Sequence, residues 1–284
     1  MKKILKNIYY SNDFHGVLVG AIAFDRGVIL IDSPLLTDSV RTWTTEVNEL
    51  EAGPDRIMIY LDAHPDRSLG AKLMDIRVLA QHETYVEYRK RSAVFKGNKF
   101  ETGSDWEFYS GFPGIRWEKP SICFTDKVVF HWSDMEVVIE HHPGPQEGAC
   151  WVEIPGKKVA FIGDAVMTKQ PPFFAKANIP KWIETLDLML SPEYQDYRFF
   201  SSRSGKVNEK DIKSMRKYLV DAHKKIERIA KRKGKPEDTE KLINKLVDNS
   251  NSLVKHRITH EFRLRYGLKN YYIKNYIEEF PEES

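Results

Sequence analysis

The sequence predicts an α/β protein with one large domain followed by a helical segment. Residues 28–34 and 56–61 are short apolar runs with the length and composition of buried strands. Between them, residues 37–51 carry Val40, Trp43 and Val47 at offsets of three and four, the spacing of one helix face. Strands that alternate with helices over a chain of 284 residues are typical of an α/β domain with a sizeable core.

The segments after residue 61 continue this alternation. The pattern predicts a helix over 68–75, a strand over 76–80 and a helix over about 83–92, followed by a long surface excursion to about residue 118. Two apolar strands, 128–132 and 135–140, flank Ser133-Asp134, a candidate hairpin turn. Strands over 150–154 and 159–162 follow, and the second ends in Gly163-Asp164.

The last part of the chain has helical patterns only, without strands. We therefore divide the protein into a domain over 1–206 and a basic helical extension over 207–284. An apolar seam with spacings of three and four predicts a helix over about 208–232, formed by Ile212, Met215, Leu219, Ala222, Ile226 and Ile229. Further helical patterns cover about 237–247, 252–265 and 269–279. A narrow seam of this kind fits dimerisation, so we expect a homo-oligomer formed through the C-terminal helices.

Charge and aromatic residues refine the expectation for the extension. It holds 19 Lys and Arg against 13 Asp and Glu, whereas the whole chain carries a net charge of only +3. The basic run over 231–235 is most simply a solvated helix end, so nucleic acid is not the expected partner. The aromatic side chains of the extension are expected to dock it onto the body or onto a second subunit: Tyr266, Tyr271, Tyr272, Tyr276 and Phe280.

Composition predicts a cytoplasmic protein without a membrane segment. The apolar stretch over 17–24 is far shorter than the roughly 20 residues that a membrane helix requires. The basic N-terminus lacks the apolar region of a signal peptide, because Tyr9 and Tyr10 begin a polar stretch. Cys123 and Cys150 lie far apart without metal-ligand spacing, and we expect two buried free thiols in a reducing compartment.

Polar residues with ligand chemistry follow two of the predicted strands. Asp62-Ala63-His64-Pro65-Asp66-Arg67 begins where the strand over 56–61 ends, and the carboxyl edge of an α/β sheet is where ligands tend to bind. His141-His142-Pro143-Gly144-Pro145 follows the strand over 135–140, and Gly163-Asp164 follows the strand over 159–162.

This ordered set resembles the metallo-β-lactamase superfamily over about residues 7–206. The first motif of that family is His-x-His-x-Asp-His, followed by a Pro-Gly-His-Thr turn, a strand that ends in Gly-Asp and a final Gly-His turn. The segment 31–34 looks like the family's early Ile-Asp-Thr/Ser turn, and 161–165 looks like the strand that delivers its bridging aspartate. The resemblance implies a four-layer αββα sandwich, here with an appended C-terminal helical segment.

The resemblance also implies a metal site with an altered set of ligands. His64, Asp66 and Asp164 occupy matching positions, and Asp62 stands where the first histidine belongs. Arg67 replaces the last histidine of the first motif, Pro145 replaces the histidine of the Pro-Gly-His turn, and 201–205 holds no histidine. The family's metals are Zn, Mn or Fe, while a ligand set so rich in oxygen favours a harder ion such as Mn²⁺ or Mg²⁺. With so many ligands replaced, a metal-free protein is the alternative.

Two functions follow from this site. In the first, a cation on Asp62, His64, Asp66 and Asp164 activates water to hydrolyse an ester, thioester or phosphodiester, Asp66 and Arg67 are catalytic, and Arg67 or Arg203 positions a small anionic substrate. In the second, the metal site has been lost and the fold serves as a binding or scaffold protein.

Plainer roles stay open for the individual residues. The carboxylates after the strand over 56–61 can cap backbone N–H groups, and Arg67 can be an internal partner for Asp62 or Asp164. His141 or His142 could replace the ligand lost at Pro145. A final group of aromatic residues can pack in the core or close over an apolar substrate as a lid: Trp106, Phe108, Tyr109, Phe112, Trp117, Phe173, Phe174 and Trp182.

Overall fold

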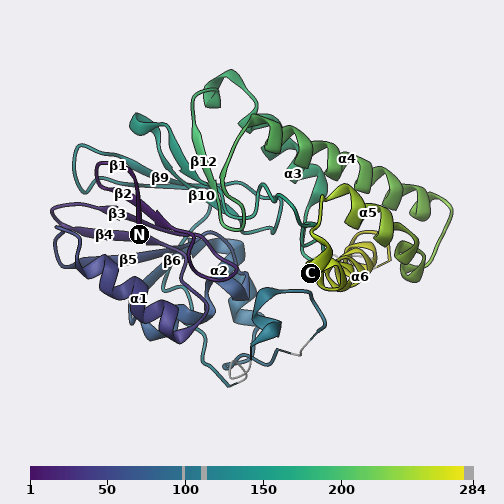
Figure 1. The fold of residues 1–284 in the computed structure, drawn as a ribbon, viewed down its shortest axis with the longest axis horizontal. Helices are drawn as coiled ribbons and strands as arrows, with labels where there is room; N and C mark the ends of the chain where they lie inside the picture. Colours follow the sequence, from purple (N-terminus) through teal and green to yellow (C-terminus); the bar gives the residue numbers. More distant parts are fainter. Residues whose placement is uncertain (98–99, 110–113, 278–284) are drawn as a thin grey trace, which may run out of the picture.

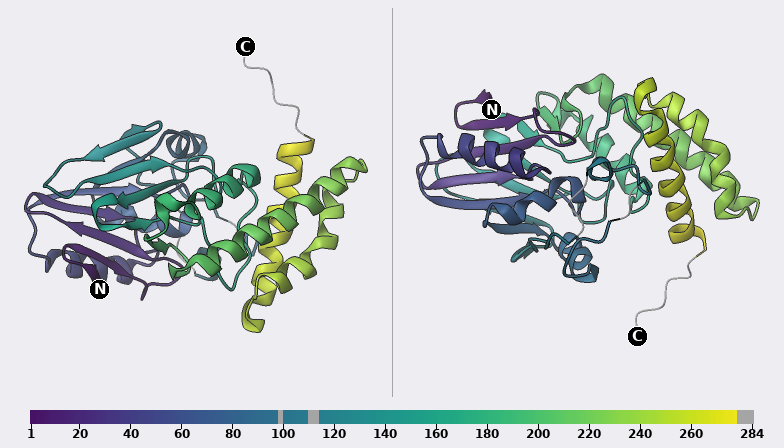
Figure 2. Two further views of the ribbon diagram at one scale, coloured as in Figure 1. Left: turned by 90° about the horizontal axis from the view of Figure 1, so that it is seen from above. Right: turned by 60° about the horizontal axis from the view of Figure 1, so that its bottom comes forward.

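Two β-sheets pack face to face between layers of helices (Figure 1). The coordinates come from a computed structural model, which describes residues 1–97, 100–109 and 114–277. The helical C-terminal segment gathers at one end of the sandwich, as the views in Figure 2 show. The predicted four-layer αββα arrangement with an appended helical segment is confirmed.

The first sheet has seven strands in sequential order. The strands are β1 (Lys2–Leu5), β2 (Ile8–Ser11), β3 (Val19–Ala23), β4 (Gly27–Ile31), β5 (Asp55–Tyr60), β6 (Arg77–Gln81) and β7 (Ile122–Phe124). β1 to β4 pair antiparallel, and β4 to β7 pair parallel. The parallel strands β4 and β5 therefore end at the same edge of the sheet.

The second sheet has six strands in the order β13-β12-β11-β10-β9-β8. The strands are β8 (Lys127–Phe130), β9 (Val137–His141), β10 (Cys150–Ile154), β11 (Val159–Phe161), β12 (Arg198–Ser201) and β13 (Gly205–Val207). Its one parallel pair is β11 with β12, so the carboxyl ends of these two strands also lie at one edge.

Six α-helices and seven short 3₁₀ helices complete the described chain. The α-helices are α1 (Thr37–Asn48), α2 (His82–Lys90), α3 (Ile179–Met189), α4 (Glu209–Lys231), α5 (Ile243–Asn249) and α6 (Arg257–Tyr276). The 3₁₀ helices are η1 (Pro65–Arg67), η2 (Leu69–Leu73), η3 (Asp105–Phe108), η4 (Pro155–Lys157), η5 (Pro192–Tyr194), η6 (Pro236–Leu242) and η7 (Val254–His256). None of these helices is both long enough and apolar enough to cross a membrane, within the residues described.

Three apolar cores correspond to the three interfaces between the four layers. Side chains such as Ile59 and Val152 fill the space between the two sheets. Trp43 of α1 packs on the outer face of the first sheet, and Trp182 of α3 packs on the outer face of the second. Burial of these large side chains stabilises the sandwich by roughly 1.5–3 kcal/mol for each one.

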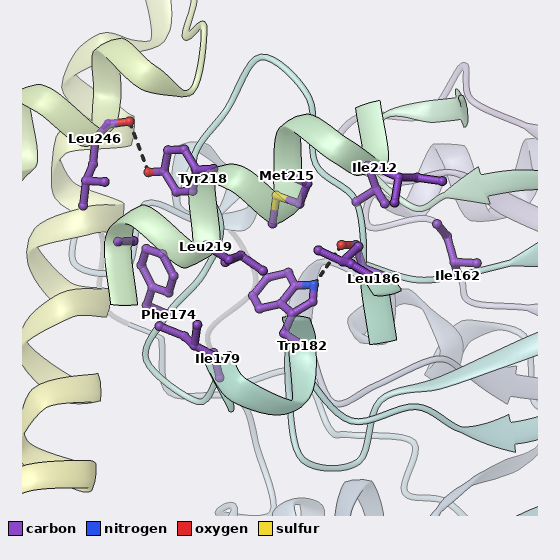
Figure 3. Close-up of a cluster of buried hydrophobic side chains, with 14 of the residues drawn as sticks. Ile162, Phe174, Ile179, Trp182, Leu186, Ile212, Met215, Tyr218, Leu219 and Leu246 are labelled. Atoms are coloured by element: carbon purple, nitrogen blue, oxygen red, sulfur yellow. Dashed lines mark hydrogen bonds between the residues drawn. The ribbon is translucent and has the colours of Figure 1, made fainter. Parts of the chain in front are cut away.

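The core on the outer face of the second sheet extends into the C-terminal helices, as Figure 3 shows. Met215 and Leu219 of α4 lie against Trp182 and Leu186 of α3, and Leu246 of α5 joins the same cluster. The indole N–H of Trp182 donates to the carbonyl of Ala165 at 2.8 Å. The seam that suggested a dimer therefore packs against the chain's own α3.

Several expectations for the secondary structure need correction. The helix expected over 68–75 is the short 3₁₀ helix η2, and the two helices expected over 252–265 and 269–279 are largely one helix, α6. Gly267 lies inside α6, where an added Cβ would come within 3.1 Å of the backbone nitrogen of Phe174. Its missing side chain allows this close packing. Both cysteines are free, but Cys123 is exposed and not buried.

Two aromatic residues of the extension dock it onto the body, whereas Tyr276 is exposed. Tyr271 and Tyr272 are buried in the core shared with α3, and the Tyr272 hydroxyl donates to the carbonyl of Gly234 at 2.7 Å. Phe112 and Phe280 lie outside the described residues.

Candidate active site: a cluster of buried aspartates and arginines

The residues of the first motif lie at the shared carboxyl edge of the two sheets. The segment after β5 turns into η1, and Asp62, His64, Asp66 and Arg67 are all buried there. Asp62 accepts a hydrogen bond from the backbone N–H of His64 at 2.8 Å, which tightens the turn. Asp66 accepts from the N–H groups of Asp105 at 3.2 Å and Trp106 at 2.8 Å, so it caps the start of η3. Capping is thus one role of these carboxylates.

The guanidinium of Arg67 lies among three carboxylates. Its Nη1 donates to Oδ1 of Asp164 at 2.7 Å, and the group forms ion pairs with Asp62 and with Asp32, whose Oδ2 lies 3.4 Å from Nε. The side chain of Arg67 is fully buried. Burial opposes its positive charge, but the carboxylates of Asp164, Asp62 and Asp32 outweigh burial and raise the pKa of Arg67.

Asp32 reaches Arg67 from the end of β4. Its backbone has φ of 56°, in the left-handed region that aspartate tolerates better than most residues. Its carboxylate accepts from the N–H of Leu61 at 3.0 Å and from the hydroxyl of Ser202 at 3.3 Å. Burial raises the pKa of Asp32 to about 7, against the opposing effect of Arg67.

A second guanidinium, that of Arg203, closes the cluster from the turn after β12. It donates to Asp66 at 3.0 Å, to Asp164 at 3.2 Å and to Asp105 at 2.8 Å. Its Nη2 also lies 2.9 Å from Nδ1 of His64. The side chain is 1% exposed, and its guanidinium is paired with the carboxylates of Asp66, Asp105 and Asp164.

The two arginines set the protonation of their neighbours. Burial and then the charge of Arg203 lower the pKa of His64 well below its ordinary value, so the imidazole is neutral. Burial alone would raise the pKa of Asp164, but Arg67 and Arg203 lower it and keep it ionised. The cluster therefore places two fixed positive charges from within the chain among five aspartates: Asp32, Asp62, Asp66, Asp105 and Asp164.

Asp164 is delivered from the second sheet by a tight turn. Gly163 follows the last apolar residues of β11 and has φ of 57°, a conformation that glycine adopts without strain. The turn aims the Asp164 carboxylate between Arg67 and Arg203, which reach it from β5 and β12. Three separate segments thus meet at one carboxylate.

As it stands, this arrangement does not fit a metal ion at the four predicted ligands. Asp62, Asp66 and Asp164 are each paired with a guanidinium, and Nδ1 of His64 faces Arg203. A divalent ion placed among them would meet one or both positive charges at close range, and ligand carboxylates must be free to coordinate. The metal role of the four residues stays a prediction.

The two histidines that could replace the ligand lost at Pro145 have other partners. His141 bonds through Nε2 to the carbonyl of Glu147 at 2.6 Å, and His142 stacks on Trp151 with ring centroids 3.9 Å apart. These contacts hold both imidazoles at the end of β9 and against β10 of the second sheet.

A cavity of about 280 Å³ opens beside His64. The aromatic residues of its wall come from three segments: Phe95, Trp106, Phe173, Phe174 and Tyr266. Its charged residues are mostly cationic: Arg91, Lys96, Glu101, Lys176 and Arg263. Phe108 is exposed, whereas Trp117 and Trp182 are buried in cores.

Phe173 separates the aspartate-arginine cluster from this cavity. Its ring centroid lies 4.6 Å from the guanidinium carbon of Arg203, 3.9 Å from that of Arg263 and 4.5 Å from the ring of His64. Arg263 of α6 is 2% exposed and donates to the carbonyls of Gly103 and Pro171. Among the described residues no carboxylate forms an ion pair with Arg263, and burial lowers its pKa to about 10.

Sequence reasoning missed three residues of the site as members. Asp32 was recognised only as part of a turn, while Asp105 and Arg263 lie in segments without a family motif. A signal existed for Asp32, since it follows a buried strand as Asp62 does. Nothing in the local pattern marks the other two, whereas Phe173 was among the aromatic residues expected to pack in the core or to form a lid.

Comparison with known proteins agrees with the fold. A sequence model described as the metallo-beta-lactamase superfamily matches residues 72–197. A search of curated protein sequences finds no match. With the four-layer fold and the ordered motifs, the match makes this chain similar to the metallo-beta-lactamase superfamily.

Solved structures share the fold at low sequence identity. The sec-alkylsulfatase Pisa1 from Pseudomonas sp. has a TM-score of 0.70 at 12% identity, over 96% of this chain and 49% of its own. This chain therefore spans about half the length of that enzyme. A metallo-beta-lactamase from Pontibacter korlensis has a TM-score of 0.57 at 16% identity, over 77% and 97%. A metallo-beta-lactamase family protein from Thermus thermophilus has a TM-score of 0.59 at 16% identity, over 93% of each chain.

Proposed function

We propose that this chain is a metallo-beta-lactamase-fold binding protein that takes up a small organic anion in the cavity beside His64, without metal-dependent hydrolysis. The observation that carries the proposal is the position of Arg203, whose guanidinium contacts three of the predicted metal ligands, His64, Asp66 and Asp164. A guanidinium keeps its charge at any ordinary pH. It therefore neutralises the carboxylates that a catalytic metal ion would need.

The cavity wall defines the class of ligand. Arg263 is buried without a carboxylate partner among the described residues, and burying an uncompensated charge is unfavourable. A bound anion near Arg263 would relieve this cost. The rings of Phe173 and Trp106 offer apolar surface to the rest of the ligand. We therefore expect an anion with an apolar body, such as an alkyl or aryl sulfate, carboxylate or phosphate.

Octyl sulfate is the first probe because one structural neighbour is named as a sec-alkylsulfatase. Isothermal titration calorimetry of the full chain should show binding of octyl sulfate and no comparable binding of the neutral detergent octyl glucoside. Since Trp106 lines the cavity, a change in tryptophan fluorescence should accompany binding. Release of inorganic sulfate should stay at the level of a protein-free control.

Variants decide whether this cavity is the binding site. Arg263→Gln should weaken octyl sulfate binding by about tenfold or more, because a hydrogen bond to a charged group contributes roughly 1.5–3 kcal/mol. Lys96→Gln removes a positive charge from an exposed position of the same cavity wall. It therefore tests whether this charge contributes to binding, without disturbing the interior. Arg265→Gln is the matched control on α6, outside the cavity wall. Equal binding of the neutral detergent, or unchanged binding in both cavity variants, would refute the proposal.

The second candidate is metal-dependent hydrolysis of an ester, thioester or phosphodiester, with Asp62, His64, Asp66 and Asp164 as ligands and Asp66 and Arg67 as catalytic residues. The match to the superfamily model and the likeness in fold to an alkylsulfatase favour it. It requires Arg67 and Arg203 to leave the carboxylates. Metal content of the wild type and of Asp66→Asn separates the two candidates. Loss of bound Zn, Mn or Fe in the variant supports hydrolysis, and equal content supports the binding protein.

Two further expectations remain proposals. A homo-oligomer would need a surface other than the seam of α4, since that seam is buried within the chain. Light scattering after gel filtration tests the oligomeric state, and fractionation of the source cells tests the expected cytoplasmic location.

A further inference from the structure

A second group of ligand-type side chains lies on the outer face of the second sheet. Glu140 and His142 are two residues apart on β9 and just after it, so their side chains point to the same face. Glu140 pairs with Trp151 of β10, and Glu153 lies two residues beyond Trp151 on the same strand. The register of this antiparallel pair therefore brings Glu140, His142 and Glu153 to one face.

The three side chains converge closely. One ligand atom from each lies within 4.8 Å of the others, and no other group of three His, Cys, Asp or Glu among the described residues does so. The imidazole of His142 is held flat against Trp151, with ring centroids 3.9 Å apart and planes inclined by 26°. This stacking leaves Nε2 aimed at Oε1 of Glu153, 3.5 Å away.

His142 Nε2 is a buried polar atom without a hydrogen-bond partner in the part of the chain that the structure describes. The residue is 7% exposed, so water does not compensate freely. Buried nitrogen atoms are nearly always bonded, and an exception calls for a ligand or another explanation. Nε2 of His142 faces Oε1 of Glu153, and an ion bound by both atoms would fit their separation.

The negative charge of Glu140 and Glu153 is also only partly compensated. Glu153 is 4% exposed, and its described polar neighbours are His142 and the hydroxyl of Tyr194, which donates to Oε1 at 3.1 Å and to Oε2 at 3.3 Å. Lys127 pairs with Glu140 at 3.2 Å from an exposed position. A cation between the two glutamates would balance the charge that remains.

We propose that Glu140, His142 and Glu153 form a binding site for one divalent transition-metal ion, with Zn²⁺ as the preferred occupant. Imidazole with two carboxylates is a ligand set that suits Zn²⁺, Mn²⁺ and Fe²⁺ better than Mg²⁺ or Ca²⁺. Ligands at about 2.0–2.2 Å around a tetrahedral ion lie roughly 3.4 Å apart. His142 and Glu153 already have this separation, and the partly exposed Glu140 has room to close on the ion.

The expected role of the ion is structural. It would tie β9 to β10 and, through the Tyr194 hydroxyl on Glu153, to η5. Three protein ligands leave a fourth position for water on the side of the exposed Glu140. The site shares no residue with the aspartate-arginine cluster, so it stands or falls independently of the proposed anion binding.

Zn²⁺ titration of chelator-treated, full-length protein tests the site. Calorimetry should show one equivalent bound, and the melting temperature should rise with Zn²⁺, because a ligand of the folded state stabilises it. Co²⁺ in place of Zn²⁺ should give the visible absorption of a four-coordinate ion. Glu140→Gln, at a partly exposed position where folding is not at risk, should weaken Zn²⁺ binding by at least about tenfold.

Paired variants identify the ligands. His142→Gln should abolish the cobalt absorption, whereas His141→Gln, at the adjacent histidine that bonds to the Glu147 carbonyl, should leave it unchanged. No Zn²⁺ uptake by the wild type would overturn the proposal and leave His142 and Glu153 as a plain buried pair. Undiminished uptake by both Glu140→Gln and His142→Gln would overturn it as well.

Discussion

Arg67 and Asp164 join the two sheets across 97 positions of the chain, with Nη1 of the arginine 2.7 Å from Oδ1 of the aspartate. Arg67 follows β5 of the first sheet, and Asp164 follows β11 of the second. Both side chains are buried, so the pair is shielded from solvent and salt. This ion pair links the two sheets at the edge where the first motif, residues 62–67, meets Asp164.

Removal of Arg67 should destabilise the fold strongly. Arg67→Met would leave Asp32, Asp62 and Asp164 buried without their common partner, and breaking a buried pair in this way costs about 3–5 kcal/mol. Urea unfolding at pH 7 measures the loss. Arg26→Met is the control, because Arg26 pairs with Asp55 at the surface and its loss should cost less than about 1 kcal/mol. Equal effects would show that the buried network contributes little.

Replacement of Arg203 by histidine should create a metal site. Arg203→His removes the guanidinium between His64, Asp66 and Asp164 and adds an imidazole, so that neutral nitrogen and free carboxylate ligands face one another. We expect one additional equivalent of Zn²⁺ over the parent, measured by calorimetry and by plasma mass spectrometry. Arg203→Gln, which removes the charge without supplying an imidazole, is the comparison. If the histidine variant binds no more Zn²⁺ than the glutamine variant, other features exclude the ion.

Asp32 should make stability fall as pH rises through neutrality. Its pKa is about 7 in the folded protein against an ordinary value of 3.8, so between these values the folded state holds a proton that the unfolded chain has released. The stabilisation that this Asp32 proton gives to the folded state is complete below about pH 4 and is lost as pH passes 7. Its slope reaches at most about 1.4 kcal/mol per pH unit.

Asp32→Asn should remove that slope while keeping a residue that tolerates the left-handed backbone at φ of 56°. Urea unfolding of the wild type and the variant between pH 5 and 8 provides the comparison. As pH rises over this range, the unfolding free energy of the wild type should fall relative to that of the variant. Parallel curves over this range would mean that Asp32 has an ordinary pKa in the folded state.

A chain shortened to residues 1–206 should not fold stably. Although the sequence suggested a boundary there, Trp182 and Leu186 share a core with Leu219 and Leu246 from the C-terminal helices. Loss of these partners would expose the apolar face of α3, and large apolar patches lead to association. Solubility and urea unfolding of the shortened chain test this. A soluble fragment with a cooperative transition like that of the full chain would instead establish 1–206 as an autonomous domain.

Local patterns predicted much of the fold. The buried runs at β4 and β5 and the helical spacing of α1 and α4 appear close to the predicted positions, because burial of one face imposes its period on the residues. The expectations that needed correction had weaker patterns. Residues 69–73 form only the 3₁₀ helix η2, and Asp75 just after it has φ of 50°, outside the right-handed helical region. The apparent break near Gly267 reflects close packing on Phe174 within one helix.

The sequence by itself determined the α/β order of the elements, the resemblance to the metallo-beta-lactamase superfamily and the presence of Asp62, His64, Asp66, Arg67 and Asp164 after strand ends. Only the tertiary structure decided what surrounds them. Asp105, Arg203 and Arg263 reach the site from loops and helices distant in sequence, and no local pattern reports such long-range contacts. Strand register likewise decided that His142 faces Glu153 and not Asp164, since alternate side chains of a strand point to opposite faces.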